Sequence, residues 1–314
     1  RTRYTWTVTV CTDAGEEAAS DENWFETGKE QEGWNAKWIG DSKARPPMYS
    51  KHIAPAKPVK SARLYICGLG LYEAYYVPGK DAVAAGSIET LRAEAKIGEE
   101  LLAPYCNNYN EWVQYQTYDV TEKLKEEGDL CVLLGNGWYF GRFGFNDPDG
   151  RPYYGKGRKL LAELRLTYED GTEEAIGTDE SWQVDYSSIF FSNIYDGEQM
   201  DDTLEPVAAA AAQVVEPPKG ALTARRSLPV KALQELPVAE LIHTPAGETV
   251  VDLGQNIAGS FRLRIHEPKG TKIHVQVGEV LQQGNFYRDN LRSAKAEYIY
   301  ISDGREHVLQ PYFT

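Results

Sequence analysis

The sequence predicts an all-β protein built from β-sandwiches. Three observations lead to this prediction. Many short segments alternate apolar and polar residues, tight-turn signals such as YEDG (168–171) and SDG (302–304) separate them, and few segments carry a helical pattern. The 314 residues are too many for one ordinary core, so the chain is expected to form two or three domains.

Predicted strands occur along the whole chain. In the opening segment RYTWTVTVCTDAG (3–15), Tyr4, Trp6, Val8 and Val10 would share one face of a strand, and the last three residues would form a turn. A lone strand is not stable, so its pairing partners must precede the segment or come from elsewhere. The other predicted strands span 62–68, 71–77, 113–120, 130–135, 159–168, 261–267, 271–281 and 296–302.

Helical patterns are confined to two segments. SIETLRAEAKIGEELL (87–102) contains good helix formers, interrupted by a glycine. EPVAAAAAQVVEPPKG (205–220) is rich in alanine and ends in prolines, so it would form either a short surface helix or a linker that runs into an extended segment. Strand patterning lapses and proline is frequent over 205–240, which places a domain boundary there.

The net charge of −14 argues against a polyanionic partner, so no nucleic-acid partner is predicted. No apolar run approaches the ~18 residues of a membrane span, so no membrane partner is predicted either. The four cysteines form no C-x-x-C pair, and Cys67 and Cys131 fall in apolar strand patterns. We expect these two to be buried free thiols, which slightly favours the cytoplasm over a secreted location.

The segment LLGNGWYFGRFGFNDPDG (133–150) is the densest group of residues suited to ligand binding. Its glycines permit tight turns, its aromatic rings offer surfaces on which sugars stack, and its amide and charged groups hydrogen-bond hydroxyls. The structural alternative is a glycine-rich hairpin whose aromatic rings close one end of a sandwich. The candidate sugar contacts are Asn136, Trp138, Tyr139, Arg142 and Asn146.

Acidic residues form pairs at Glu99–Glu100 and Asp201–Asp202, and Glu198 lies shortly before the second pair. Facing carboxylates serve as acid and base in glycosidases, and carboxylates also bind Ca²⁺. An exposed acidic turn is the simpler interpretation, because nothing in the sequence brings two carboxylates face to face. The five histidines are scattered and match no catalytic motif, so the residues by themselves predict no catalytic site.

Eight segments of distinctive sequence follow one another over residues 30–314. They are WNAKWIG (34–40), ARLYICGLGLYEAYY (62–76), VQYQTYDVT (113–121), LLGNGWYFGRFGF (133–145), TDESW (178–182), IYDGEQMDD (194–202), DLGQNIAG (252–259) and GEVLQQGNFYRDNLRSA (278–294). In this order they resemble the bacterial α-L-rhamnosidases, a family of glycoside hydrolases. The opening strand and NWFETG (23–28) resemble the end of a fibronectin-III-like domain that often precedes these modules.

The resemblance implies two consecutive β-sandwich, jelly-roll-like domains preceded by the tail of a fibronectin-III-like domain. Residues 1–29 would be this tail, residues 30–235 a carbohydrate-binding-like jelly roll with a linker at 205–235, and residues 236–314 the second β-sandwich. The family continues into a large (α/α)₆ barrel that carries the catalytic carboxylates, and these match no position in this sequence.

The resemblance also implies a function. The chain would be the accessory region, for substrate binding or as a scaffold, of an enzyme that removes terminal α-L-rhamnose from glycosides by an inverting mechanism. Its partners would be a glycan that contains L-rhamnose and the parent's catalytic domain. Two alternatives stay open: a rhamnose- or glycan-binding module, and a purely structural pair of domains that braces the barrel.

The resemblance requires no cofactor, but in some relatives the jelly roll binds rhamnose through Ca²⁺. Glu99 and Glu100 lie near the corresponding acidic position and are therefore the candidate metal ligands. The sequence departs from the family at two places. It has Gly98-Glu99-Glu100 where the family has Gly-Asp, and NNY (107–109) where the family commonly has TDY.

Overall fold

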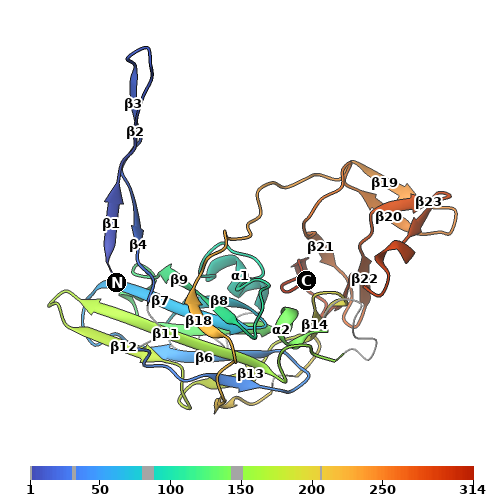
Figure 1. Ribbon diagram of the computed structural model, residues 1–314. Coiled ribbons are helices and arrows are strands. Elements are labelled where there is room, and N and C mark those ends of the chain that lie inside the picture. The colour runs from blue at the N-terminus through green and yellow to red at the C-terminus, as the bar shows by residue number, and fades with distance from the viewer. Residues whose placement is uncertain (1, 30–32, 80–87, 143–150, 206) are drawn as a thin grey trace.

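The computed structural model describes residues 2–29, 33–79, 88–142, 151–205 and 207–314, and these residues are mostly strands (Figure 1). Two short helices accompany them in the described ranges: α1 (Ile88–Glu94) and the one-turn α2 (Gly137–Phe140). The predicted all-β fold class is confirmed.

Two antiparallel-dominated sheets stack to form the jelly-roll sandwich (Figure 1). The five-stranded sheet has the order β16 (Ala210–Ala211), β13 (Gln183–Tyr186), β6 (Pro47–Ile53), β10 (Gly128–Gly135) and β8 (Leu71–Pro78). The seven-stranded sheet has the order β17 (Gln213–Val214), β5 (Ile39–Asp41), β11 (Arg158–Tyr168), β7 (Val59–Leu69), β9 (Trp112–Asp119) and β18 (Ala221–Ala224), with β12 (Glu173–Gly177) paired to β11.

Strand β10 shows how the five-stranded sheet is buried on both faces. Leu130, Val132 and Leu134 point into the core between the two sheets. Cys131 and Leu133 point the other way and pack with α1 and the C-terminal residues. This continuous apolar run is typical of a strand that is covered on both sides.

A second unit lies on the outer face of the five-stranded sheet, and it shares strands with the first. In its four-stranded sheet, β14 (Ile189–Asn193) and β15 (Gly197–Asp201) join β25 (Glu297–Ile301) and β22 (Lys272–Gln276). Strands β15 and β25 run parallel, and a side chain at Gly197 would collide with the backbone of Glu297. Three two-stranded pairs complete the unit: β19 (Glu240–His243) with β20 (Thr249–Asp252), β21 (Leu263–His266) with β26 (Glu306–Leu309), and β23 (Val280–Gln282) with β24 (Asn285–Tyr287).

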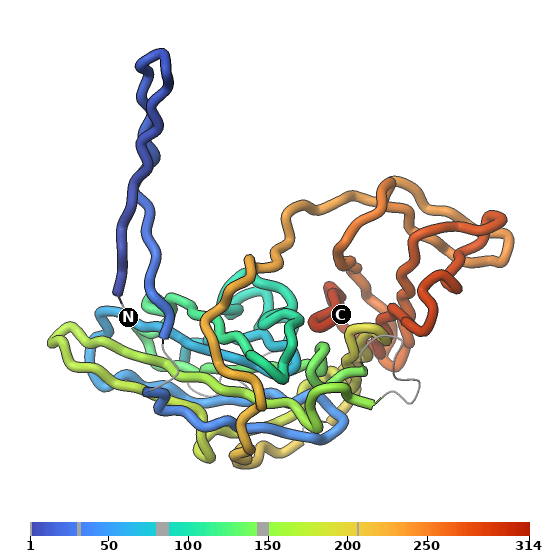
Figure 2. The backbone as a smooth tube through the Cα atoms, in the orientation of Figure 1, coloured from blue at the N-terminus to red at the C-terminus, as the bar shows by residue number. Residues whose placement is uncertain are grey.

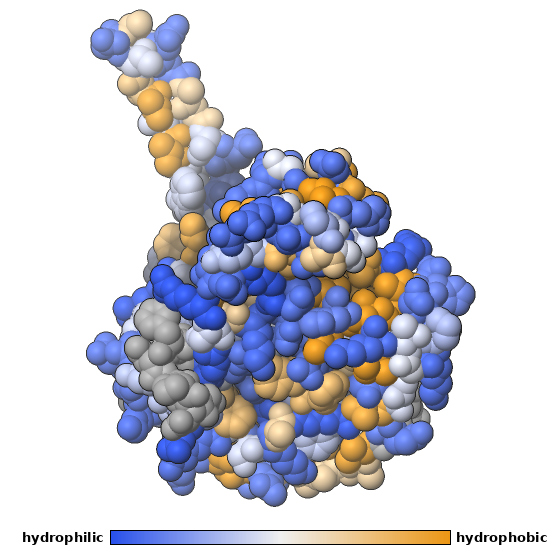
Figure 3. Space-filling view, turned by 90° about the vertical axis from the view of Figure 1, so that its right-hand side faces the viewer, coloured by the Kyte–Doolittle hydropathy of each residue, from blue (hydrophilic) through white to orange (hydrophobic). Residues whose placement is uncertain are grey.

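The N-terminal arm (residues 3–26) projects from the sandwich (Figure 1). It is a long hairpin of β1 (Arg3–Trp6), β2 (Thr9–Cys11), β3 (Glu17–Ala19) and β4 (Asn23–Glu26), in which β1 pairs with β4 and β2 with β3. The partner of the opening strand therefore follows it in the chain. Figure 3 shows orange, hydrophobic surface on the arm. The large apolar and aromatic residues exposed there are Tyr4, Trp6, Val8, Val10, Trp24 and Phe25.

The predicted helices are largely wrong. Within 87–102, the described helix ends at Glu94. The alanine-rich segment forms neither a helix nor a plain linker, because its β16 and β17 add to the edges of the sandwich sheets. Strand β18, which follows the segment, adds to β9 in the same way. Pairing with an exposed sheet edge satisfies backbone hydrogen bonds and overrides the helix propensity of alanine. The segment that joins β18 to β19 then crosses to the second unit (Figure 2).

The predicted strands of the sandwich are confirmed to within three residues at each end. The 271–281 strand is wrong as a single element, because it divides into β22 and β23. Cys67 and Cys131 are buried free thiols, as predicted, and burial raises the pKa of both. Among the described residues, no helix is long and apolar enough to cross a membrane.

A buried carboxylate holds the C-terminal residues against the five-stranded sheet. Glu198, on β15, is fully buried, and its oxygens accept hydrogen bonds from the backbone N–H groups of Tyr312 (3.1 and 3.2 Å) and Phe313 (3.1 Å). Arg92 of α1 donates to the carbonyl of Pro311 at 3.0 Å. The ring of Phe313 lies directly on Gly135, where a side chain would collide with it. Burial raises the pKa of Glu198 to about 8.

We predict that Glu198→Ala lowers the free energy of unfolding by about 2–4 kcal/mol, because two buried backbone N–H groups lose their acceptor. Urea unfolding at pH 7 measures this change. Glu94→Ala, which removes an exposed carboxylate from the neighbouring helix, is the matched control and is expected to change stability little. Equal effects of the two substitutions would contradict this account of the C-terminal residues.

Candidate functional site

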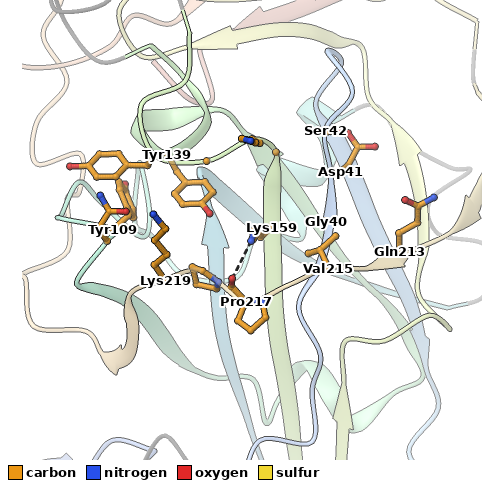
Figure 4. Close-up of a pocket in the computed structure, with 16 residues that line it drawn as sticks. Gly40, Asp41, Ser42, Tyr109, Tyr139, Lys159, Gln213, Val215, Pro217 and Lys219 are labelled. Carbon is orange, nitrogen blue, oxygen red and sulfur yellow. Dashed lines mark hydrogen bonds between the residues drawn. The ribbon is translucent and has the colours of Figure 1, made fainter.

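The candidate site is a pocket of about 420 Å³ beside the seven-stranded sheet (Figure 4), a size within the usual range for small-molecule sites. We call it the tyrosine pocket. Its lining residues are Gly40, Asp41, Ser42, Tyr109, Asn110, Tyr139, Tyr154, Gly155, Lys156, Gly157, Lys159, Gln213, Val215, Pro217, Pro218 and Lys219. They come from segments far apart in the sequence: β5, the loop before β9, α2, the loop before β11, and the chain around β17.

Three tyrosines form the aromatic wall of the pocket. The ring of Tyr109 meets the ring of Tyr139 edge to face, with centroids 5.4 Å apart, and meets the ring of Tyr154 in the same way at 4.9 Å. The Tyr109 hydroxyl donates to the carbonyl of Tyr105 at 2.8 Å. Burial raises the pKa of all three phenols, so they stay neutral. Tyr109 and Tyr139 are buried and support Tyr154, whose partly exposed ring is the one that a ligand can reach.

The loop before β11 lies flat against the pocket floor because two of its residues are glycines. A side chain at Gly155 would collide with the ring of Tyr139, and one at Gly157 would meet the backbone of Asp41 at 2.8 Å. The backbone N–H of Gly155 also donates to the carbonyl of Tyr139 at 2.9 Å. These contacts fix the position of Lys156, which stands between the two glycines.

Lysines dominate the charged groups of the pocket. Lys156 and Lys219 are exposed at its rim, whereas Lys159 is half-buried and donates to the carbonyls of Glu216 (2.6 Å) and Pro217 (3.3 Å). Burial lowers the pKa of Lys159. Asp41 is the single carboxylate among the described lining residues.

The structure places one of the five predicted sugar contacts, Tyr139, in the tyrosine pocket. The side-chain oxygen of Asn136 accepts from Arg158 at 3.0 Å, and Trp138 packs half-buried between two of the apolar cores. Asn146 lies outside the described residues. That these residues contact sugar stays a prediction.

Arg142 joins the two units. Its guanidinium forms a two-pronged ion pair with Asp196, with N–O distances of 2.8 and 2.9 Å, and donates to the carbonyl of Ser293 at 2.5 Å. The side chain is almost fully buried. The planar guanidinium thus links the segment after α2 to the segment of Ser293, about 150 residues later in the chain. Its predicted role as a sugar contact stays a prediction.

The two candidate metal ligands form separate ion pairs. Glu99 is exposed and lies 2.9 Å from the ammonium of Lys231, while Glu100 lies 2.8 Å from the guanidinium of Arg225. The ion pair with Lys231 holds the pKa of Glu99 below its usual range. Ca²⁺ binding at this position remains a prediction, and it would require both carboxylates to leave their present partners.

The second acidic pair is not the exposed turn that the sequence favoured. Glu198 is fully buried, and the side chain of Asp202 is 8% exposed. The hydroxyl of Tyr300 donates to Asp202 at 2.7 Å. Glu198 and Asp202 are buried because β15 pairs with β25 and because the C-terminal residues pack against this sheet.

Asp202 also belongs to a cluster with His307 and Asp303, the one group of three metal-type ligands in the described ranges. His307 lies 2.9 Å from Asp303 through Nε2 and 2.7 Å from Glu89 through Nδ1. Burial lowers the pKa of His307, but its bonds to Glu89 and Asp303 outweigh burial and raise the pKa overall. The His307 ring therefore joins α1 to β26.

Sequence reasoning missed most of the tyrosine pocket. Tyr154, Lys156 and Lys159 lie in YYGKGRK (153–159). In this segment aromatic, glycine and lysine residues precede a strand, and this composition could have identified it as a candidate binding loop. Tyr109 and Lys219 carried no such signal. The fold brings them to the pocket from loops that lack any distinctive pattern.

Comparisons with known proteins identify the family. The model for the α-L-rhamnosidase N-terminal domain matches residues 57–234, which is more than half of the chain. The chain belongs to the α-L-rhamnosidase family. The model for the bacterial α-L-rhamnosidase concanavalin-like domain matches residues 242–314 of the same rhamnosidase chain, and the resemblance noted in the sequence is confirmed.

Similar curated proteins and solved structures support the same family. An α-L-rhamnosidase of Streptomyces avermitilis is 34% identical over 276 residues, which are 83% of this chain and 25% of the relative. The crystal structure of the Aspergillus terreus α-L-rhamnosidase has a TM-score of 0.86 at 31% identity, covering 99% of this chain and 37% of that one. The Streptomyces avermitilis enzyme complexed with L-rhamnose has a TM-score of 0.74 at 28% identity, covering 98% and 32%. The rhamnosidase chain thus spans about a quarter of the length of this curated relative.

We predict that His307→Gln destabilises the protein by about 2 kcal/mol at pH 6, because charged hydrogen bonds in a buried setting are lost. The pKa of His307 is raised above 6.5, so its stabilising effect is complete below pH 6.5 and is lost as the pH rises through the raised value. Melting temperatures between pH 6 and pH 9 should therefore converge for the two proteins. His266→Gln, at an exposed position on β21, is the control, and a pH-independent gap for His307→Gln would contradict the ionic role.

Proposed function

We propose that this chain is the accessory region of an α-L-rhamnosidase, which binds sugar in the tyrosine pocket and supports a catalytic domain through its second unit. The parent enzyme would hydrolyse terminal α-L-rhamnose from glycosides by an inverting mechanism, with both catalytic carboxylates outside this chain. The observation that carries the proposal is the composition of the pocket: three tyrosine rings and several hydrogen-bonding groups surround a space of about 420 Å³ that contains a single carboxylate.

An inverting glycosidase needs two carboxylates about 6.5–9.5 Å apart with a water between them. The tyrosine pocket does not have this pair in the described part of the chain, because Asp41 is its single carboxylate. Asp41 already accepts hydrogen bonds from the Tyr186 hydroxyl (2.8 Å) and the backbone N–H of Lys43 (2.7 Å). The pocket is thus equipped to hold a sugar rather than to hydrolyse it.

The supporting role rests on apolar surface in the second unit. Val277, Val280, Leu281 and Val308 are large apolar residues exposed there. Val277, Val280 and Leu281 are close together in the chain, and exposed apolar patches are typical of surfaces that another domain covers. A purely structural pair of domains, the second candidate function, is supported by the same residues and predicts no binding in the tyrosine pocket.

The 314-residue chain is expected to show no turnover of an aryl α-L-rhamnoside, since the pocket lacks the acid–base pair. Release of the aryl group, followed by absorbance, measures this. The Streptomyces avermitilis α-L-rhamnosidase serves as the positive control under identical conditions. Enzymatic release by the chain, lost on Asp41→Asn, would show that the machinery lies within it and would refute the accessory role.

Calorimetric titration with L-rhamnose tests the binding role. We expect measurable binding, weakened about tenfold by Tyr154→Ala, because a ring that contacts the sugar contributes roughly 1–1.5 kcal/mol. Tyr4→Ala, on the exposed arm, is the matched control. Titrations with and without Ca²⁺ test Glu99 and Glu100: equal affinities are expected because Lys231 and Arg225 already neutralise both carboxylates. A flat titration for the unmodified chain would favour the structural alternative.

A further inference from the structure

Asp202, Asp303 and His307 meet beside α1, where the two units join. Asp202 follows β15, Asp303 lies in the turn between β25 and β26, and His307 lies on β26. Their side chains are each at most 10% exposed, and their ligand-type atoms all lie within 4.8 Å of one another. Two carboxylates and one imidazole at this separation form a mixed oxygen and nitrogen donor set, which suits divalent transition-metal ions.

The distances within this group fit a metal-binding geometry. Nε2 of His307 lies 2.9 Å from Oδ1 of Asp303 and 3.9 Å from Oδ2 of Asp202. Two ligands of a tetrahedral Zn²⁺ ion, each bound at about 2.0–2.2 Å, are separated by about 3.3–3.6 Å. The two observed distances lie on either side of this separation. Small shifts of the side chains would therefore bring the imidazole nitrogen and one oxygen of each aspartate to a common ion.

Groups outside the set hold the candidate ligands in place. Nδ1 of His307 lies 2.7 Å from one oxygen of Glu89, whose other oxygen accepts from the backbone N–H of Val308 at 2.6 Å. The hydroxyl of Tyr300 donates to Asp202 at 2.7 Å. Histidine ligands of metal ions usually donate their second ring nitrogen to such a carboxylate, which directs the first nitrogen toward the ion. Glu89 thus orients Nε2 of His307 toward the two aspartates.

The charges around the imidazole favour a divalent cation. Glu89, Asp202 and Asp303 supply three carboxylates. The guanidinium of Arg305 pairs with Asp303 at 2.6 Å, which leaves a surplus of two negative charges on these described groups. A proton on the His307 ring offsets one of the two charges, whereas a divalent cation bound to the neutral ring offsets both. Because uncompensated charge is costly at a buried position, a divalent cation balances the site more completely than a proton.

We propose that Asp202, Asp303 and His307 bind a divalent transition-metal ion such as Zn²⁺, with Glu89 as the residue that positions His307. The ion binds Nε2 of His307 and one oxygen of each aspartate, and a water completes the four positions. Coordination uses the lone pair of Nε2, so a proton on that atom passes to solvent, while the proton on Nδ1 stays in the hydrogen bond to Glu89. The ion fastens the second unit to the jelly roll. The site is independent of sugar binding, since none of its residues lines the tyrosine pocket.

Calorimetric titration of the EDTA-treated and desalted 314-residue chain with ZnCl₂ tests the site, at about pH 8, where protons compete less for Nε2. We expect one Zn²⁺ ion per chain, and a melting temperature that rises with Zn²⁺ because the ion binds the folded state. Asp303→Asn and His307→Gln are expected to lose this binding, since each removes a ligand. Glu89→Gln keeps all three ligands and is expected to weaken binding about 10–100-fold.

His52→Gln is the matched control. His52 also lies 2.8 Å from a carboxylate, that of Asp129, but its side chain is 41% exposed. We expect this substitution to leave the one-to-one binding of Zn²⁺ unchanged. Titration with CaCl₂ should show binding at least about tenfold weaker at the cluster, because Ca²⁺ prefers oxygen ligands to an imidazole.

Co²⁺ in place of Zn²⁺ reports the geometry directly. We expect the visible absorption of a four-coordinate Co²⁺ site in the unmodified chain, and its loss in His307→Gln, with circular dichroism to show that the variant is folded. Absence of one-to-one Zn²⁺ binding by the unmodified chain would overturn the proposal. Binding that survives both ligand substitutions would do so too, because the ion would then lie elsewhere. If those two variants fail to fold, Glu89→Gln decides, and an unchanged affinity for Zn²⁺ counts against the site.

Discussion

The five-stranded sheet, with apolar residues buried on both of its faces, is the constraint on which the rest of this structure depends. One face closes the jelly-roll core, and the other receives α1, the shared four-stranded sheet and the C-terminal residues. Strand β10 supplies both cores with alternate side chains. Because apolar burial is the main favourable term in folding, the two units are stabilised as one body rather than as two tethered ones.

Buried polar groups complete this arrangement at the places where the two units meet. Glu198 binds backbone N–H groups, Arg142 binds Asp196 and the carbonyl of Ser293, and His307 lies between two carboxylates. A buried polar group without such partners destabilises the fold, whether charged or neutral, so each of these groups fixes the relative position of the segments that it joins. The tyrosine pocket draws on none of these three groups.

The sequence predicted local features better than long-range ones. Apolar strand patterns located β7, β8, β10 and β11 to within three residues, because a strand covered on one or both faces must carry apolar residues on those faces. The alanine-rich segment was misjudged because its conformation is set by a sheet edge built from residues distant in the chain. Tyr139 was singled out for its aromatic and glycine-rich surroundings, and it lines the tyrosine pocket. The ion pair of Arg142 with Asp196 was not predicted, because its partner is 54 residues away and nothing in the sequence announces the contact.

The shared sheet has a consequence for how such proteins are assembled in evolution. Strands β14 and β15 precede the crossing segment, while their neighbours β25 and β22 follow it. A recombination event that exchanged either unit at the crossing segment would separate strands that need one another, and would expose the edge of β25. The jelly roll and the second unit are therefore expected to be exchanged between proteins only as a pair.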